Sequence, residues 1–355
     1  MKYKAAVIGC GRIGCGFDDD YERRNITYTH AGAYAKTDLI DFVAIADVEQ
    51  YKIDRYSKKY NVRGYTDYKE LLDIESPDIV SVSTRPDTHC EIIEACVAAG
   101  VRAIYCEKPI DNSLDKAKKI IGLCSKNKVL LTVNHQRRYG KFHQQLARAI
   151  QSGALGSIQQ CTVYYTAGIA NTGSHFIDLL RFYLGKEVKS VRGKHSINKS
   201  TNEFDPNIDG WIIFDGGITA SIQPCANFGI LEVIIVSDAG RFVINMTAPF
   251  TSEPFFTYEK VVANSCFDGA TKLKKHLSLP DPLGAITDYS YEYMLGAIEH
   301  IIQHLENKNN IMETISTGHD ALCALEVIHA LIHSSNQNGE SVSLPFGKHI
   351  EIQGR

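Results

Sequence analysis

Short apolar runs alternate with amphipathic stretches along the first third of the chain. The runs predict buried strands at residues 5–8, 42–46, 62–65, 79–83, 103–106 and 129–133. The stretches between them carry apolar residues at helical spacing, as at Ala117, Ile120, Ile121 and Cys124. This alternation is typical of a doubly wound parallel sheet with helices on both faces. We therefore predict an α/β domain over residues 1–134.

The pattern changes beyond about residue 150, where apolar and polar residues alternate with period two and Gly, Asp and Asn mark the turns. It predicts strands at residues 159–165, 188–196, 211–214, 218–223, 231–236 and 241–246. A helix over residues 174–184 interrupts them. Two amphipathic helices close the chain, one with a stripe of Tyr291, Met294, Leu295, Ile298, Ile302 and Leu305, the other with Leu322, Leu325, Val327, Ile328, Leu331 and Ile332.

These elements predict an α+β domain over residues 135–355 with an open, mostly antiparallel sheet, whose closing helices can also pack back on the first domain. It would bind substrate and carry the oligomer contacts. Because an open sheet face must be covered, we expect a homodimer or homotetramer formed through that face.

Gly9, Gly11 and Gly14 directly follow the first predicted strand. At this spacing the first glycine makes a tight turn, the second lets a pyrophosphate approach, and the third lets the helix pack on the strand. Arg12 and Ile13 begin that helix, whose free N–H groups attract an anion. The chain is therefore predicted to begin with a Rossmann domain that binds a dinucleotide.

Asp47 ends the second predicted strand, where a carboxylate can accept hydrogen bonds from the adenosine ribose and repel a 2′-phosphate. NAD is therefore favoured over NADP. Asp47 follows Gly14 by 33 positions, where about 20 is usual; the polar residues 17–28 can form a loop that absorbs the excess. The alternative is that Asp47 is an ordinary residue of a strand-end turn.

Ligands of open α/β sheets bind beyond the carboxyl ends of the strands. Two further groups of cofactor-binding candidates lie there: Thr84, Arg85, Pro86 and His89, and the pair Glu107 and Lys108. Pro109 biases Lys108 toward an extended conformation. A nearby nicotinamide and partial burial would lower the pKa of Lys108, which could then bind a substrate hydroxyl or carry its proton. It could equally be a surface lysine before a turn.

His175 falls in the first turn of the helix predicted near Thr172, where a general base for an alcohol can lie. Asn171 and Ser174 flank it and are predicted to line the same substrate site. The alternative makes Asn171 a helix cap and His175 an ordinary polar residue.

Arg137, Arg138 and Tyr139 follow the last strand of the first domain. Two guanidinium groups there could hold a phosphate of a phosphorylated or nucleotide-linked sugar. They could equally pair with Asp or Glu where the two domains meet.

Composition narrows the class of protein. The chain has 355 residues, more than a domain with a single hydrophobic core usually contains. Its 44% hydrophobic and 22% charged residues are ordinary for a globular protein, and its net charge is −3. This charge provides no argument for nucleic acid or an anionic membrane as partner. The ten cysteines lack C-x-x-C pairs, no apolar run is long enough to span a membrane, and the histidines lack metal-ligand spacing. We expect a cytoplasmic protein with reduced thiols and no metal.

The motifs together resemble the Gfo/Idh/MocA oxidoreductases, which include glucose–fructose oxidoreductase and inositol dehydrogenases. The resemblance rests on Gly9-x-Gly11-x-x-Gly14, Asp47, Ser83-Thr84-x-Pro86-x-x-His89, Glu107-Lys108-Pro109, Gly173-x-His175-x-x-Asp178, Gly318-His319-Asp320-Ala321-Leu322 and Gly339-x-x-Val342-x-Leu344-Pro345. It implies that Lys108 and His175 form a catalytic pair. Asn171 stands where the family commonly has aspartate, and Arg85 where a proline often follows Ser-Thr.

The resemblance implies hydride transfer between a carbinol carbon of a carbohydrate or cyclitol and nicotinamide C4. His175 would take the hydroxyl proton while Lys108 orients the oxygen, and Asn171 could bind substrate or His175 without supplying a charge. Two alternatives remain open: an NAD-dependent glycosidase of the same family, and a non-catalytic NAD-binding sensor or co-regulator. Retention of both Lys108 and His175 argues against the sensor.

Overall fold

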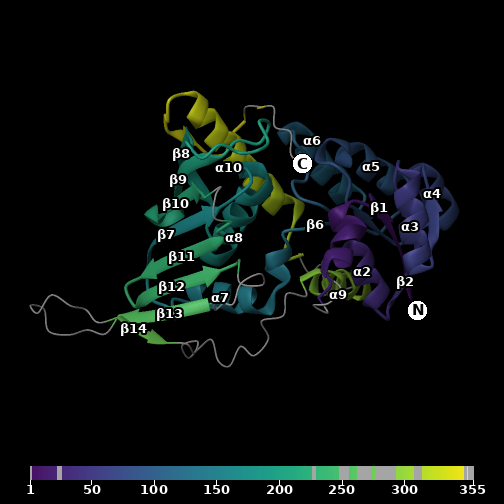
Figure 1. Cartoon of the computed structure of the whole chain (residues 1–355), viewed down its shortest axis with the longest axis horizontal. Helices are drawn as coiled ribbons and strands as arrows, with labels where there is room; N and C mark the ends of the chain where they lie inside the picture. The colour runs from purple at the N-terminus through teal and green to yellow at the C-terminus, as the bar shows by residue number, and fades with distance from the viewer. Residues whose placement is uncertain are drawn as a thin grey trace, which may run out of the picture. The chain divides into compact units, whose positions relative to one another are not determined.

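The computed structural model describes residues 2–21, 26–225, 229–247, 256–261, 273–276, 293–307, 314–347 and 350. Packing divides the chain into two compact units (Figure 1). The first contains residues 1–140, 290–322 and 354–355, and the second contains residues 141–289 and 323–353. The sequence places the division at residue 134, whereas α9 (Tyr293–Glu306) and the first turn of α10 (Gly318–Asn336) belong to the first unit.

A parallel six-stranded sheet in the order β3-β2-β1-β4-β5-β6 forms the centre of the first unit. Helices follow the strands as a doubly wound fold requires, which confirms the predicted fold class. The strands are β1 (Tyr3–Ile8), β2 (Ile40–Ala46), β3 (Arg63–Tyr65), β4 (Ile79–Val82), β5 (Ala103–Cys106) and β6 (Leu130–Val133). The helices are α1 (Phe17–Tyr21), α2 (His30–Lys36), α3 (Gln50–Tyr60), α4 (Tyr68–Glu75), α5 (Pro86–Ala98) and α6 (Leu114–Lys126).

Helix α9 completes the core of this unit, although it lies far along the chain. Its apolar stripe includes the fully buried residues Met294 and Ile298, which share one hydrophobic cluster with Tyr34 of α2 and Tyr105 of β5. Tyr291, predicted to begin that stripe, lies outside the described residues.

A nine-stranded mixed sheet dominates the described part of the second unit, in the order β14-β13-β12-β11-β7-β10-β9-β8-β15 (Figure 1). All of its neighbouring pairs are antiparallel except β7 and β10, which are parallel. The strands are β7 (Ile158–Tyr165), β8 (Val188–His195), β9 (Ile208–Phe214), β10 (Thr219–Pro224), β11 (Glu232–Ser237), β12 (Gly240–Asn245), β13 (Phe256–Val261), β14 (Leu273–His276) and β15 (Val342–Ser343).

Three helices pack on one face of this sheet: α7 (Lys141–Gln151), α8 (Ser174–Leu184) and the second-unit part of α10. Gly193 of β8 and Gly210 of β9 make room for α10, because a Cβ at either position would lie within 3.0 Å of Leu331. Phe142 of α7 contacts Phe256 of β13, with ring centroids 5.3 Å apart.

The sequence prediction misses two features of these helices. The sequence predicts a helix over residues 91–99, whereas α5 begins at Pro86, because proline is well suited to the first helical turn, where no backbone donor is needed. The sequence analysis predicts no helix at α7, which has a strong amphipathic pattern but lies where the pattern of apolar residues changes, near residue 150. No helix among the described residues is long and apolar enough to cross a bilayer.

Candidate active site

One row of paired residues brings the predicted site segments to the same edge of the parallel sheet. Ile8 is aligned with Ala46 and with Val82, Val82 with Cys106, and Cys106 with Val133. Each of the five is the last residue of its strand. The segments that follow therefore leave the sheet side by side, beginning with Gly9, Asp47, Ser83, Glu107 and Asn134.

The glycine turn has the geometry that a pyrophosphate needs. Gly9 has φ +100°, and a Cβ there would lie 2.6 Å from the backbone of Ser83. A Cβ on Gly14 would lie 2.0 Å from the carbonyl oxygen of Gly9, so this residue sets the close approach of turn and helix. A Cβ on Gly11 would meet no heavy atom within 4 Å. The space over Gly11 is thus open for a ligand, and the residues present fit a dinucleotide.

A π-helical turn, Arg12–Gly16, follows Gly11 and runs into α1. The Arg12 guanidinium lies over the Phe17 ring at 4.6 Å and pairs with Asp20 at 2.9 Å. Its side chain is therefore held on α1, while the backbone N–H groups at the start of the turn remain the anion-binding groups.

Asp47 is fastened to the same turn. Its Oδ2 accepts a hydrogen bond from the Cys10 N–H at 2.7 Å, and its Oδ1 accepts one from the Glu49 N–H at 3.0 Å. Helix α1 lies within the long interval before Asp47 and is tied to α3, where Asp19 pairs with Arg55 at 2.7 Å. A short helix thus occupies the start of a segment predicted to be a loop.

Of the next predicted group, His89 is fully buried against protein atoms. Its ring nitrogens lie 3.1 Å from the Thr84 carbonyl oxygen and 3.2 Å from that of Ile110. Burial lowers the pKa of His89, which keeps the ring neutral. His89 therefore links the ends of β4 and β5. Arg85 and Pro86 begin α5 beside it, and contact of this group with a cofactor stays a prediction.

Glu107 lies in a buried polar cluster that the sequence does not reveal. Its carboxylate lies 2.9 Å from Nε2 of His30 and accepts hydrogen bonds from the Asn134 amide and, at 3.2 Å, the Lys108 N–H. The other ring nitrogen of His30 lies 2.9 Å from Ser81 Oγ. Burial acts to raise the pKa of Glu107, but the His30 contacts, with Asn134 and Lys108, outweigh it and hold that pKa below its usual value.

This cluster fixes the backbone that presents Lys108. Lys108 is half-buried, directly follows the anchored Glu107, and precedes Pro109 through a cis peptide bond. His30 was missed because a single histidine at a helix start carries no pattern. Its partner is 77 positions away.

The segment after β6 forms a 3₁₀ turn, Gln136–Tyr139, that carries the predicted arginine pair. Arg138 is buried, pairs with Asp320 at 3.1 Å and donates to the Ile315 carbonyl oxygen at 3.0 Å. Tyr139 is also buried, 3.4 Å from Thr314 Oγ1. Arg138 thus joins the turn to the start of α10 within the first unit, and Arg137 is half-buried on the same turn.

The second unit holds Asn171, Ser174 and His175. A π-helical turn, Ile169–Gly173, leads directly into α8, and His175 is half-buried in the first turn of that helix. Ser174 is buried, and its hydroxyl donates to the Asn171 carbonyl oxygen at 3.0 Å. Helix α8 is anchored by Arg181, whose Nε donates to Glu187 at 2.8 Å.

The chain resembles known oxidoreductases. Residues 3–135 match the family GFO_IDH_MocA, described as an oxidoreductase family with an NAD-binding Rossmann fold. The uncharacterized oxidoreductase YrbE of Bacillus subtilis is 24% identical over 370 residues, which cover 98% of this chain and 96% of the relative. Over residues 3–135, the chain is thus similar to the NAD-binding domain of the Gfo/Idh/MocA oxidoreductases. NAD is the cofactor named for its first domain.

Two further relatives show how far the likeness extends. Inositol 2-dehydrogenase of Rhizobium meliloti is 28% identical over 207 residues, 54% of this chain and 58% of the relative. The chain thus spans about half the length of the first curated relatives that it matches. The WlbA dehydrogenase from Bordetella pertussis, in complex with NADH and UDP-GlcNAcA, has a TM-score of 0.74 at 18% identity, covering 98% of this chain and 100% of that one. At this identity it shows the shared fold.

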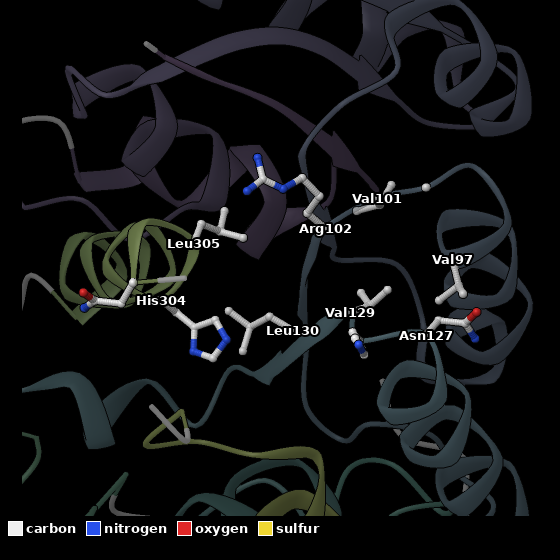
Figure 2. A pocket seen from close by; sticks show the side chains of 11 residues that line it. Val97, Val101, Arg102, Asn127, Val129, Leu130, His304 and Leu305 are labelled. Atoms are coloured by element: carbon white, nitrogen blue, oxygen red, sulfur yellow. The ribbon is translucent and has the colours of Figure 1, made fainter. Parts of the chain in front are cut away.

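A pocket of about 410 Å³ lies at the opposite edge of the parallel sheet (Figure 2). It is lined by Arg102, just before β5, by Leu130 at the start of β6, and by His304 of α9. The family's cofactor turn follows the other ends of the strands, so this pocket is separate from the candidate site. No three histidine, cysteine or carboxylate side chains within the described ranges are grouped to hold a metal.

Gly11→Ala is expected to weaken cofactor binding, whereas Gly14→Ala is expected to destabilise the fold. Gly11 has ordinary extended backbone angles, so Gly11→Ala should keep the melting temperature of wild type and weaken NADH binding about tenfold, or ~1.4 kcal/mol, by filling the open space. Gly14→Ala should destabilise the fold, because its Cβ meets the Gly9 carbonyl oxygen. NADH fluorescence titration and thermal unfolding measure both. Gly122→Ala, on an exposed helix face with no neighbour within 4 Å, is the matched control. Unchanged NADH affinity in Gly11→Ala would contradict the assignment.

His30→Leu is expected to destabilise the first unit by about 3–5 kcal/mol at neutral pH, because it leaves a buried carboxylate without its partner. Burial is then opposed only by Asn134 and Lys108, and we expect it to raise the pKa of Glu107 above the unfolded value. The resulting penalty grows as pH rises, so the deficit relative to wild type should be largest at pH 7.5 and smaller at pH 5. Thermal unfolding at both pH values measures it.

Tyr34→Phe is the control for His30→Leu, because it removes only a neutral hydrogen bond to Ser81 in the same cluster. It should cost about 1 kcal/mol at either pH. A His30→Leu deficit that does not change with pH would show that Glu107 is not ionised.

Proposed function

We propose that this protein is an NAD-dependent dehydrogenase acting on a secondary hydroxyl of a sugar, sugar nucleotide or cyclitol. One observation carries the proposal: the aligned row that ends the strands of the parallel sheet. It places the glycine turn, open over Gly11, at the same edge as Asp47 and as the segment that carries Lys108. A dinucleotide and a substrate-orienting amine are thereby offered at one sheet edge.

Bound NAD supplies the hydride acceptor at nicotinamide C4. Lys108 donates a hydrogen bond to the substrate oxygen and stabilises the negative charge that develops there. His175 takes the hydroxyl proton as general base. Asn171 is the neighbouring hydrogen-bonding group and carries no charge.

Asp47 supports NAD over NADP. Its carboxylate is held against the glycine turn by the Cys10 N–H, where it can accept from a ribose hydroxyl through its remaining lone pairs. Glu49 adds a second carboxylate two residues later, and it is paired with Lys52. A 2′-phosphate would be repelled at this position.

Arg138 bears on the choice of substrates to test. Its ion pair with Asp320 engages one of the two guanidinium groups that could hold a substrate phosphate. The relatives that this chain resembles include an inositol and an apiose dehydrogenase. Uncharged polyols, inositols and free sugars therefore come first in a screen, and sugar nucleotides second.

The deciding test is NADH absorbance during incubation of the protein with NAD and each compound class. Net NADH formation with one class supports a dehydrogenase. Cleavage of a glycoside without net NADH would favour the NAD-dependent glycosidase, and NAD binding without turnover of any class would favour a sensor.

Lys108→Ala is expected to lower kcat at least a thousandfold, because it removes both the orienting donor and the charge at the substrate oxygen, an effect on the order of 4 kcal/mol. NADH affinity should stay within about twofold, since the glycine turn and Asp47 are unchanged. Lys126→Ala, at the end of α6, is the control and should match wild type. Substantial turnover by Lys108→Ala would remove the lysine from the mechanism.

We also propose a homodimer or homotetramer through the open face of the second sheet. The strand register aligns one row across this face: Arg192, Trp211, Ser221, Thr162, Ile234, Val243 and Thr257. Trp211 is 45% exposed, and Ile234 and Val243 are half-buried. A second copy would cover the three apolar side chains of this row, Trp211, Ile234 and Val243, and place two sheets face to face.

Trp211→Glu is expected to dissociate that oligomer by burying a charge against the partner's sheet. Sedimentation at micromolar protein should show the mass of one chain for the variant and a multiple of it for wild type. Ile74→Glu replaces another exposed apolar residue, on α4, and should keep the wild-type mass. A wild-type protein that sediments as a single chain would refute the proposed interface.

A further inference from the structure

Three consecutive residues of a distant loop hold the backbone that leads to His175. Four successive N–H groups, those of Gly168, Ile169, Ala170 and Asn171, open the π-helical turn before α8. Their acceptors are Asn207 Oδ1 at 2.9 Å, the Pro206 carbonyl oxygen at 3.0 Å, Asp205 Oδ1 at 2.8 Å and Asp205 Oδ2 at 2.9 Å. These donors have no acceptor within their own helical turn. The loop between β8 and β9 therefore acts as the cap of this segment.

Asp205 makes the central part of this cap, and the turn is shaped to receive it. Asp205 is fully buried. A Cβ on Gly168 would lie 2.1 Å from Asp205 Oδ2, and Gly168 has φ +92°. Only glycine leaves both the space and the backbone freedom for the carboxylate at this point.

The loop that carries Asp205 is itself fixed to the sheet. Ile208, which begins β9, donates its N–H to the Tyr165 hydroxyl at 2.7 Å and accepts from it at 3.0 Å. Asn207 donates through Nδ2 to the Asn198 carbonyl oxygen at 2.7 Å. The position of Asp205 is thereby set by β7 and β9.

The π-helical turn is tightly packed, so the position of its first residues also fixes the position of His175. Gly173 packs tightly on Ile169, since a Cβ there would lie 2.7 Å from its Cδ1. The Ser174 hydroxyl closes on the Asn171 carbonyl oxygen. Asn171, held by Asp205, and His175 are thus four residues apart on one continuous helical segment, which corresponds to a rise of about 6 Å.

We propose that Asp205 is a positioning residue for the reaction: it fixes Asn171 and His175 from outside the motif that contains them. This rests on the proposed function, in which His175 is the base. The carboxylate also places a negative charge at the start of this helical segment, where the backbone carries partial positive charge. Asn171 brings no charge to this segment, so the carboxylate at its start comes from Asp205.

The experiment uses the full-length protein with Asp205→Asn and Asp205→Ala. Asparagine keeps one acceptor oxygen but turns an N–H donor toward a backbone N–H, whereas alanine removes both acceptors. Hydrogen exchange of the Gly168–Asn171 amides should be at least about tenfold faster in Asp205→Asn, and faster still in Asp205→Ala. With the substrate found by the screen, kcat should fall at least about tenfold, again more in Asp205→Ala. KM for NAD should stay within about twofold, because the cofactor turn lies in the other unit.

Asp238→Asn is the matched control. Asp238 accepts a hydrogen bond from the Ser157 N–H at 2.9 Å and lies where a Cβ on Gly156, at φ +79°, would come within 2.1 Å. It repeats the same contact in the turn between β11 and β12. Its variant should keep the wild-type exchange rates at Gly168–Asn171 and the wild-type kcat, with all variants assayed below their unfolding temperatures.

Two results would overturn the proposal: exchange at Gly168–Asn171 that is unchanged in both Asp205 variants, or a kcat that falls no further in them than in Asp238→Asn. If wild type turns over no compound, the proposed function fails. The exchange measurement still decides whether Asp205 holds the turn.

Discussion

The candidate site depends on the register of the parallel sheet in the first unit. Ala46, Ile8, Val82, Cys106 and Val133 are aligned across neighbouring strands and are the last residues of their strands. The strands end in buried, mostly apolar residues, and a group of polar residues begins where pairing stops. A shift of one residue in one strand would bury a glycine, a carboxylate or a lysine and turn its side chains to the other face. The hydrophobic effect that aligns the strands thus also brings together the groups that bind and react.

Buried charged groups also hold the segments that leave this edge of the sheet. The pKa of the buried Glu107 is held below its usual value because His30, Asn134 and the Lys108 N–H surround its oxygens. Burying such a cluster costs free energy, and removing one member leaves a buried charge without its partner. The cluster makes the residue before Lys108 rigid. The polar segment that follows the glycine turn has a comparable effect, since Asp19 and Asp20 tie α1 to Arg55 and Arg12. The long interval before Asp47 is therefore partly ordered structure.

Much of this arrangement follows from local sequence. Glycine spacing predicts the turn, because each glycine answers a steric demand of its immediate surroundings. Apolar runs that end in polar residues predict the sheet edge. His30 and Asp205 could not be predicted in the same way, because each acts through partners 77 and 34 or more positions away. The start of α5 differs from the predicted one for a smaller reason: proline often marks a loop, but it is also well suited to a first helical turn.

The two units position their candidate side chains in different ways. In the first, parallel strands deliver chemical groups to an edge, and each segment is short. In the second, the strands are mostly antiparallel and offer no such common edge, so a helix start has to present His175. That start contains an irregular turn whose N–H groups need acceptors, and a loop ending in Asp205, Pro206 and Asn207 provides them. The backbone before His175 is thus held by a few hydrogen bonds and fits closely at one glycine, Gly168.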